Sequence, residues 1–188
     1  RTGGDRVHAH TLRAEVDRHA ATFLQAAHPL SAQRRRAATG LALALREELA
    51  SLAMPEARCE MRFAPQELTQ GQWGRRGVDE AELFLAANVG EDARPLAKIA
   101  SGGELSRVML ALKSIATIDY PGKTLIFDEV DAGIGGHTAD VVGARLRRLG
   151  ARFQVLCITH LPQVAAHGHA HFRVTKTIER GRTRTQVE

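Results

Sequence analysis

The most informative segment of the chain is Thr124-Leu125-Ile126-Phe127-Asp128-Glu129, in which four residues typical of a buried strand end in two adjacent carboxylates. Side chains that end a strand lie at the carboxyl edge of an α/β sheet, where such sheets bind ligands. A first carboxylate there can hold Mg²⁺ between phosphate oxygens. The next points differently, because side chains alternate along a strand, and it can orient or deprotonate water. A pattern this short also occurs by chance, so it needs support from other motifs.

Ser101-Gly102-Gly103-Glu104 opens a segment in which apolar residues recur at helical spacing. Ser101 is predicted to cap this helix, and Ser-x-x-Glu is also the pattern of a capping box, which needs no ligand. The same helix start exposes amide groups at the positive end of the helix dipole, and this favours an anion. Capping does not require two glycines, so Gly102 and Gly103 favour an anion site over plain capping.

Val155 to His160 predicts a second apolar strand that ends in polar side chains, on the same sheet edge as Asp128. His160 could donate a hydrogen bond to a phosphate. A single histidine at a strand end is more often structural, so its interpretation depends on the neighbouring motifs.

Around these motifs the sequence predicts alternating helices and strands. From residue 101 onward, helices are expected at about 103–117, 137–149 and 162–167, and strands at 124–127, 154–158, 172–178 and, after a turn at 180–182, 183–187. Helices between short apolar strands predict a parallel sheet covered on both faces. Earlier in the chain, strands are expected at 58–63 and 82–88, with a long loop between them.

The N-terminal segment, from about residue 5 to residue 52, has apolar residues in steps of three and four and few strand formers. This spacing predicts helix. His28-Pro29 interrupts the series, because a proline disfavours helical backbone in the residue before it, so two helices or one broken helix are expected. The spacing fits a coiled-coil seam or an ordinary amphipathic helix equally well.

Composition and charge exclude several classes of protein. The longest apolar runs, such as Leu41 to Leu45, are far shorter than the roughly 18 residues that a membrane span needs, so no membrane protein is expected. Cys59 and Cys157 have no ligand spacing beside them, which excludes a disulfide framework and fits a reducing cytosol. The formal net charge of +5 suits a polyanionic partner, although the arginines are spread along the whole chain.

The order and spacing of the motifs resemble those of ABC-type ATPases. Ser101-Gly102-Gly103-Glu104 resembles the signature motif, Asp128-Glu129 the Walker B motif, Asp131 the D-loop and His160 the switch histidine. More narrowly, residues 96–107 and 128–136 resemble the RecN family of bacterial SMC-like DNA repair proteins. Residues 158–165 and 52–55 extend this resemblance over most of the chain.

The resemblance implies an α/β fold, namely the C-terminal lobe of an ABC/SMC-type ATPase head. Residues 54–188 would form this P-loop NTPase-like lobe, with a mostly parallel sheet and flanking helices, and residues 1–53 would be a helical stump of the returning coiled coil. Gly122-Lys123-Thr124 mimics the end of a Walker A loop, but Thr117 stands where that motif needs a glycine, and a strand follows instead of a helix. The Walker A lobe is therefore expected outside this chain, which makes the ATPase incomplete here.

The same resemblance implies ATP and Mg²⁺ as cofactors, and it implies a role for each residue of the Walker B motif, the D-loop and the switch histidine. Asp128 would help to hold Mg²⁺, and Glu129 would be the general base for the attacking water. His160 would contact the γ-phosphate, and Asp131 would couple the two sites of a head dimer.

The residues Ser101, Gly102, Gly103 and Glu104 would bind the γ-phosphate of ATP held by the opposite head, so that hydrolysis requires two heads. The implied function is ATP-dependent head dimerisation in DNA double-strand break repair and recombination. The implied partners are DNA, the Walker A lobe of the same protein and a second head, in the cytoplasm and on the nucleoid, without a membrane. The alternatives are another SMC-like, nuclease-associated or transporter ATPase, or a non-catalytic DNA-binding scaffold. The run Asp131 to Gly136 argues against the other ATPases.

Overall fold

The computed structural model describes residues 2–99, 101–116, 122–179 and 182–188, and the described side chains begin at His8. The chain divides into two compact units. The first unit contains the described residues up to Glu47 together with Glu56–Lys98, and the second contains Glu48–Pro55 together with the described residues from Ile99 onward. These units cut across the expected division into 1–53 and 54–188, which stays a prediction. Among the described helices, none combines the length and apolar character of a membrane span.

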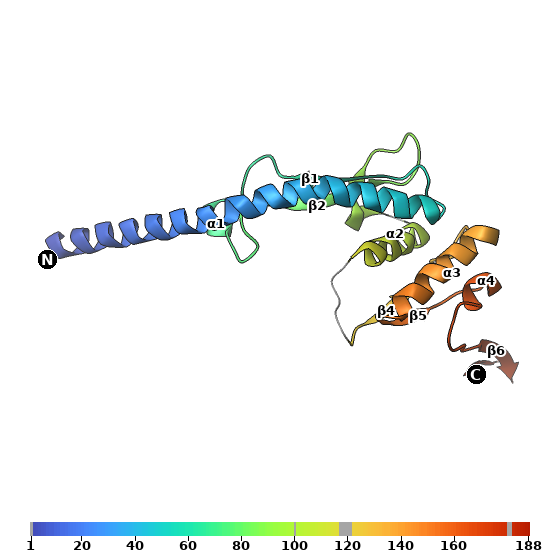
Figure 1. Cartoon of the computed structure of the whole chain (residues 1–188). Coiled ribbons are helices and arrows are strands. Elements are labelled where there is room, and N and C mark those ends of the chain that lie inside the picture. Colours follow the sequence, from blue (N-terminus) through green and yellow to red (C-terminus); the bar gives the residue numbers. More distant parts are fainter. Residues whose placement is uncertain (1, 100, 117–121, 180–181) are drawn as a thin grey trace. The chain divides into compact units, whose positions relative to one another are not determined.

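Helix α1 (Thr2–Ser51) is one continuous α-helix with Pro29 inside it, so the break expected at this proline is wrong (Figure 1). A proline in a helix interior removes a hydrogen bond and costs about 3 kcal/mol. Tertiary contacts on both sides of Pro29 offset this cost: Ala27 is buried, and the Ser31 hydroxyl donates to Asp79 Oδ1 at 2.6 Å. Contacts distant in sequence therefore keep the helix intact.

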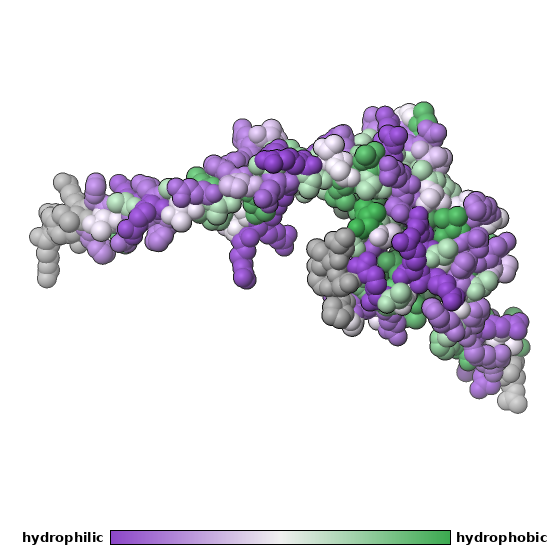
Figure 2. All heavy atoms as spheres, viewed as in Figure 1, coloured by the Kyte–Doolittle hydropathy of each residue, from purple (hydrophilic) through white to green (hydrophobic). Residues whose placement is uncertain are grey.

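The early part of α1 has a mostly hydrophilic surface (Figure 2). Two large apolar side chains, Leu12 and Val16, are nevertheless 47% and 52% exposed, and they lie four positions apart on one helix face. This arrangement fits the expected coiled-coil stump, and the coiled coil itself stays a prediction.

The sheet of the first unit is antiparallel and has the order β1-β2-β3. Strand β1 (Arg58–Phe63) pairs with β2 (Ala81–Ala86), and the short strand β3 (Arg94–Pro95) pairs with β2. Strand β1 alternates exposed and half-buried residues, as predicted. The single 3-10 turns η1 (Gln70–Gln72) and η2 (Leu96–Lys98) complete the unit.

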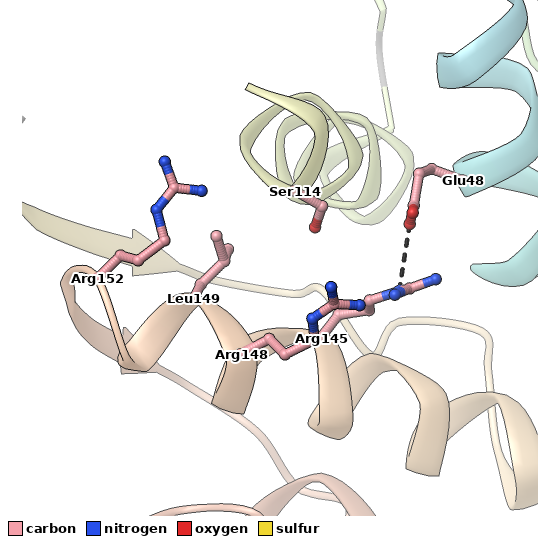
Figure 3. A pocket seen from close by; sticks show the side chains of 6 residues that line it. All are labelled: Glu48, Ser114, Arg145, Arg148, Leu149 and Arg152. Atoms are coloured by element: carbon pink, nitrogen blue, oxygen red, sulfur yellow. Dashed lines mark ion pairs between the residues drawn. The ribbon is translucent and has the colours of Figure 1, made fainter. Parts of the chain in front are cut away.

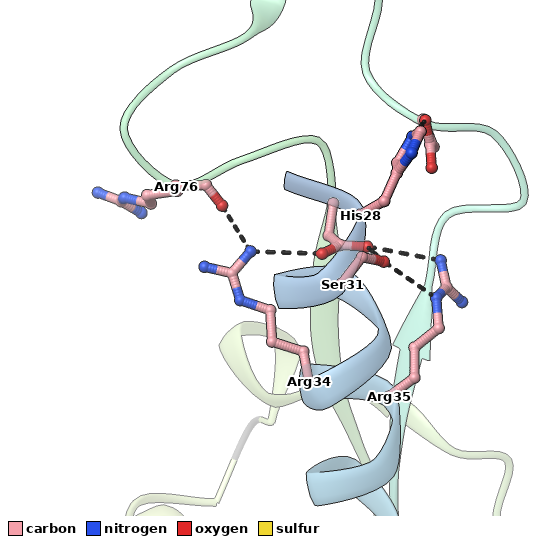
Figure 4. Close-up of polar contacts among 7 residues, drawn as sticks. His28, Ser31, Arg34, Arg35 and Arg76 are labelled. Atoms are coloured by element: carbon pink, nitrogen blue, oxygen red, sulfur yellow. Dashed lines mark hydrogen bonds and ion pairs between the residues drawn. The ribbon is translucent and has the colours of Figure 1, made fainter. Parts of the chain in front are cut away.

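A buried aspartate fastens α1 to the loop between β1 and β2 (Figure 4). The side chain of Asp79 is 2% exposed and forms ion pairs with Arg34 at 3.3 Å and Arg35 at 3.6 Å, besides its bond to Ser31. Arg34 Nη1 also donates to the backbone carbonyl of Arg76. This carboxylate thus has one hydroxyl and two guanidinium partners inside the first unit.

The same loop is anchored by Trp73, whose ring stacks on Phe23 of α1 with centroids 4.8 Å apart. Its indole Nε1 donates to the carbonyl of Leu68 at 2.8 Å. The glycine-rich loop around this aromatic is therefore a packed part of the first unit, and the catalytic residues predicted from sequence lie elsewhere.

From Ile99 onward, the described residues of the second unit form seven regular elements close to their predicted positions. They are α2 (Gly102–Ile115), β4 (Thr124–Phe127), α3 (Gly136–Gly150), β5 (Gln154–Cys157), α4 (Pro162–Ala165), β6 (Val174–Glu179) and β7 (Arg182–Val187). Each end lies within two residues of its prediction. The predicted hairpin turn at Arg180-Gly181, and Thr117 at the predicted end of α2, lie outside the described residues.

Strands β4 and β5 are parallel, as predicted, but helices cover only one face of them in the described chain. Phe127 is 5% exposed toward the helix side. On the other face, Ile126, Leu156 and Ile158 are 68%, 45% and 60% exposed. The predicted cover on both faces is thus wrong for the described residues, since they supply no element for the second face.

The C-terminal hairpin is separate from this parallel sheet. Strand β6 pairs only with β7 among the described strands, and the pairing is antiparallel. The strand predicted at 172–178 is therefore present, but it does not extend the parallel sheet.

Candidate functional site

A tight turn follows β4 and carries the two predicted carboxylates. Asp128 and Glu129 are both exposed at the carboxyl end of the strand. Glu129 has a φ of 55°, in the left-handed region that residues with a Cβ disfavour by roughly 1 kcal/mol. The Ala132 N–H donates to the Glu129 carbonyl at 3.0 Å and closes the turn. This strained turn fixes where the two carboxylates stand.

The start of α2 lies directly against this turn. Ser101 caps the helix as predicted, because its hydroxyl accepts a hydrogen bond from the Glu104 N–H at 3.3 Å. A side-chain carbon at Gly102 would collide with the Glu129 carboxylate, and one at Gly103 would lie 3.1 Å from the Glu129 carbonyl oxygen. The glycine pair therefore has an intramolecular reason, the close approach of helix and turn, which the sequence argument for a ligand did not consider.

Two further side chains of α2, which sequence reasoning missed, bond to the same turn. Ser106 Oγ donates to the Asp128 carbonyl at 2.6 Å, and Arg107 Nη1 donates to the Ala132 carbonyl at 2.8 Å. Arg107 is only 7% exposed. The apolar spacing of α2 did not point to it, because residues that recur at helical spacing, such as Leu105 and Leu112, lie on the opposite helix face.

Asp131 lies at the end of the turn and reaches the end of β5. Its side chain is 4% exposed, and its Oδ2 accepts hydrogen bonds from Thr159 Oγ1 at 2.5 Å and from the His160 backbone N–H at 3.1 Å. Burial raises the pKa of this carboxyl, but the bonds from Thr159 and His160 outweigh it, so the pKa is lower than its ordinary value. The buried group is therefore held as a carboxylate.

His160 is oriented by this carboxylate. Its Nδ1 lies 3.2 Å from Asp131 Oδ2, while its side chain is 74% exposed. With Nδ1 occupied, Nε2 is the ring nitrogen free to meet a ligand. Thr159 was missed by sequence reasoning, although it is the polar residue next to His160. The role of Asp131 across a head dimer stays a prediction, and in this structure its carboxylate faces inward.

The structure thus brings the predicted residues to one end of the second unit. The Glu129 carboxylate lies against Gly102 at the start of α2. The Asp131 carboxylate, at the end of the same turn, accepts a hydrogen bond from the His160 backbone N–H. Within the described chain, no cluster of three or more His, Cys, Asp or Glu side chains could hold a metal alone.

A hollow of about 150 Å³ lies elsewhere in the second unit (Figure 3). It is lined by Glu48, Ser114, Arg145, Arg148, Leu149 and Arg152. Arg145 Nε lies 3.2 Å from Glu48 Oε2, and this ion pair fastens the last turn of α1 to α3. None of the predicted site residues lines this hollow.

The sequence is similar over most of its length to bacterial proteins named DNA repair protein RecN. It is 42% identical over 181 residues to RecN of Xylella fastidiosa (strain Temecula1 / ATCC 700964), a match that covers 96% of this chain and 32% of that protein. It is 44% identical over 179 residues to RecN of Deinococcus radiodurans, covering 95% of this chain and 31% of that protein. No protein-family model matches the chain.

Among solved structures, the chain resembles the Smc head domain with a coiled coil and joint from Pyrococcus yayanosii. The TM-score is 0.50 at 15% identity, and the match covers 96% of this chain and 33% of that chain. This likeness concerns the fold alone, and it confirms the predicted α/β fold of an SMC-type head. Over nearly its whole length this chain is related to RecN, as its motifs predicted, and it spans about a third of the length of the RecN proteins that it matches.

Proposed function

We propose that this chain is the C-terminal lobe of an ATP-hydrolysing, SMC-like head that acts in DNA double-strand break repair and recombination. The observation that carries the proposal is the juxtaposition of the capped Ser101 helix start, the Asp128-Glu129 turn and the Asp131-oriented His160. Phosphoryl transfer depends mostly on positioning and on electrostatic stabilisation, and this arrangement of charges and donors suits it.

The residues present fit ATP and Mg²⁺. Mg²⁺ is usually bound through one or two carboxylates together with substrate phosphates, and Asp128 offers an exposed carboxylate at the sheet edge. When bound, Mg²⁺ would neutralise charge on the phosphates. The Glu129 carboxylate lies against Gly102 at the start of α2, where the helix dipole favours an anion.

Each predicted residue then has a task. Glu129 orients the attacking water and accepts its proton, and His160 contacts the γ-phosphate through Nε2 while Asp131 holds Nδ1. Ser101 and the amides of the two glycines present hydrogen-bond donors to the γ-phosphate of ATP on a second head. The Glu104 N–H donates to the capping Ser101 hydroxyl, and the Glu104 carboxylate, which can only accept, is not one of these donors.

The apolar face of the parallel sheet supports a second lobe that carries the Walker A motif. Ile126 on β4, Leu156 on β5 and Ile158 directly after β5 are large apolar side chains left exposed. An apolar face of this kind on a sheet normally packs against another layer. The relatives are about three times as long as this chain, so such a lobe has room in a RecN-type protein.

The partners and location follow from the same proposal. DNA is the expected polyanionic partner of a chain with a net charge of +5 whose relatives are named DNA repair proteins. A second head is the expected homodimer partner, and the cytoplasm and nucleoid are the expected location.

The first test compares this chain alone with the chain reconstituted with the Walker A lobe. The chain alone is expected to hydrolyse ATP at most feebly, and the reconstituted head is expected to turn over. Glu129→Gln should then slow hydrolysis by about 100-fold or more while ATP still binds. A Glu129→Gln head as fast as the wild type would refute the catalytic assignment and favour a non-catalytic DNA-binding scaffold.

The second test addresses the opposite-head site. Ser101→Arg is expected to block ATP-driven dimerisation, measured by light scattering, without weakening ATP binding to a single head. Unchanged dimerisation would contradict the placement of Ser101 on the nucleotide of a second head.

A further inference from the structure

Arg107 is a buried arginine whose position packing alone does not explain. It is 7% exposed and shares a helix face with Leu110 and Ala111, which are both fully buried. Its Nε is buried and has no hydrogen-bond partner within the part of the chain that the structure describes. Burying a guanidinium with an unpaired nitrogen is unfavourable, so an apolar side chain would suit this position better if packing were its only role.

The contacts of Arg107 lead to the turn that carries the carboxylates. Its Nη1 donates to the Ala132 carbonyl at 2.8 Å, at one end of the turn. From the neighbouring position on α2, Ser106 Oγ donates to the Asp128 carbonyl at 2.6 Å, at the other end. Two adjacent side chains of one helical turn thus hold both ends of the segment 128–132.

The glycine pair tightens this junction. A Cβ at Gly103 would lie 2.9 Å from the Ala132 Cβ, closer than such atoms pack. The helix start and the turn are therefore in close contact as well as hydrogen bonded. A displacement of the first turn of α2 must move segment 128–132 with it, or break the bonds from Ser106 and Arg107.

We propose that Arg107, together with Ser106, is a positioning residue that couples the two half-sites carried by this chain. The proposal rests on the proposed function, in which Ser101 to Gly103 meet the nucleotide of a second head and Asp128 and Glu129 serve the nucleotide of their own head. Arg107 follows the helix start on α2 and bonds to the turn at Ala132, so it links the two groups. Its bond to Ala132 transmits engagement of the helix start to the carboxylates, so hydrolysis in each head depends on the other.

The test uses the assembled head, meaning this chain together with its Walker A lobe. Arg107→Met removes the donors and keeps the side-chain length, and Arg107→Lys keeps the charge and a shorter donor. Arg148→Met is the matched control, because Arg148 is an exposed arginine on α3. The measurements are ATP affinity of single heads, kcat, KM and the Hill coefficient for ATP.

Arg107→Met is expected to lower kcat by about tenfold with ATP affinity within about twofold of the wild type. The Hill coefficient should fall from about 2, the number of coupled sites, toward about 1. Arg107→Lys should recover part of both values, and Arg148→Met should match the wild type.

A kcat and Hill coefficient equal to those of the wild type in Arg107→Met would overturn the proposal. An equal loss of ATP affinity and kcat would also overturn it, because that is the result expected of a residue with a purely structural role. If Arg107→Met does not fold, Ser106→Ala decides: a lowered Hill coefficient supports the coupling, and an unchanged one overturns it. Glu129→Gln in the same preparation separates the two proposals. A fast Glu129→Gln head refutes the proposed function, whereas a slow one beside a normal Arg107→Met head refutes only the coupling.

Discussion

Each of the two units contains an aspartate whose side chain is almost fully buried, and the negative charges of the two carboxylates are stabilised by different kinds of partner. Asp79 in the first unit, 2% exposed, is paired with the guanidinium groups of Arg34 and Arg35. Asp131 in the second unit, 4% exposed, accepts from a hydroxyl and an amide and holds the ring of His160. A buried carboxylate needs partners in either case. The partners decide whether it fastens two segments or orients an exposed group.

The difference separates a structural aspartate from one at a candidate site. The arginines of Asp79 belong to α1, so the pair secures a helix to a loop. The imidazole beside Asp131 is 74% exposed, so one side of it remains available to a ligand. Four changes would test this comparison, and the loss of Asp79 is expected to have the greatest effect.

Asp79→Ala should produce the largest loss of stability. Removing the buried partner of two arginines costs several kcal/mol when the cations are also buried. The side chains of Arg34 and Arg35 are 36% and 49% exposed, so water can hydrate them after the change. The expected loss of stability is therefore about 2 kcal/mol. Trp73 is the only tryptophan of the chain and lies in this unit, so its fluorescence during urea unfolding reports the loss. Glu67→Ala, which removes a half-exposed partner of His28, is the control and should change stability by less than about 0.5 kcal/mol.

Asp131→Ala should destabilise the second unit by about 1 to 2 kcal/mol, because the Thr159 hydroxyl and the His160 amide lose their acceptor. Hydrogen exchange followed by mass spectrometry should show faster exchange at residues 158–161, with the Trp73 transition unchanged. Asp140→Ala, at a carboxylate that is 61% exposed and paired with His167, should leave this exchange as it is. Equal effects of the two variants would contradict the distinction drawn for Asp131.

The contribution of Asp131 to the free energy of unfolding should decrease at low pH. Its pKa is lower in the folded protein than its ordinary value, so its stabilisation is complete above about pH 4 to 5 and is lost as pH falls through the folded pKa. The stability difference between wild type and Asp131→Ala should be constant from pH 7 to pH 5 and shrink below about pH 4. A stability difference that grows as the pH falls would contradict the lowered pKa of Asp131.

The two cysteines give the smallest and most local test. Burial raises the pKa of Cys59 to about 11. Burial also raises that of Cys157 to about 11, with smaller contributions from the charges of Asp131 and Asp128. Both thiols should therefore react slowly with iodoacetamide at pH 8. Asp131→Asn should speed alkylation of Cys157 by a few-fold and leave Cys59 unchanged, as peptide mapping would show.

The positions of most elements could be predicted because each rests on local pattern. The apolar strands at 124–127 and 154–157 and the capped helix at 102–115 need only their own residues to be recognised. The break at Pro29 was wrongly predicted because the contacts that offset it, such as Ser31 with Asp79, join residues 48 positions apart.

The candidate site could be predicted only in part for the same reason. Motif order pointed to the residues that would meet ATP, since phosphate chemistry requires carboxylates, amides and a histidine at one edge. Ser106, Arg107 and Thr159 were missed because their bonds reach partners 22, 25 and 28 positions away. No local period or spacing encodes a hydrogen bond of that kind.

Local pattern was enough to predict most strand and helix positions, the α/β class and the relationship to RecN, because hydrophobic periodicity and short motifs are properties of neighbouring residues. Tertiary structure alone decided that α1 continues through Pro29, that one face of the parallel sheet stays exposed within the described chain, and that Asp131 turns inward to hold His160. Each of these outcomes depends on which distant segments pack together, and packing is set by the whole fold.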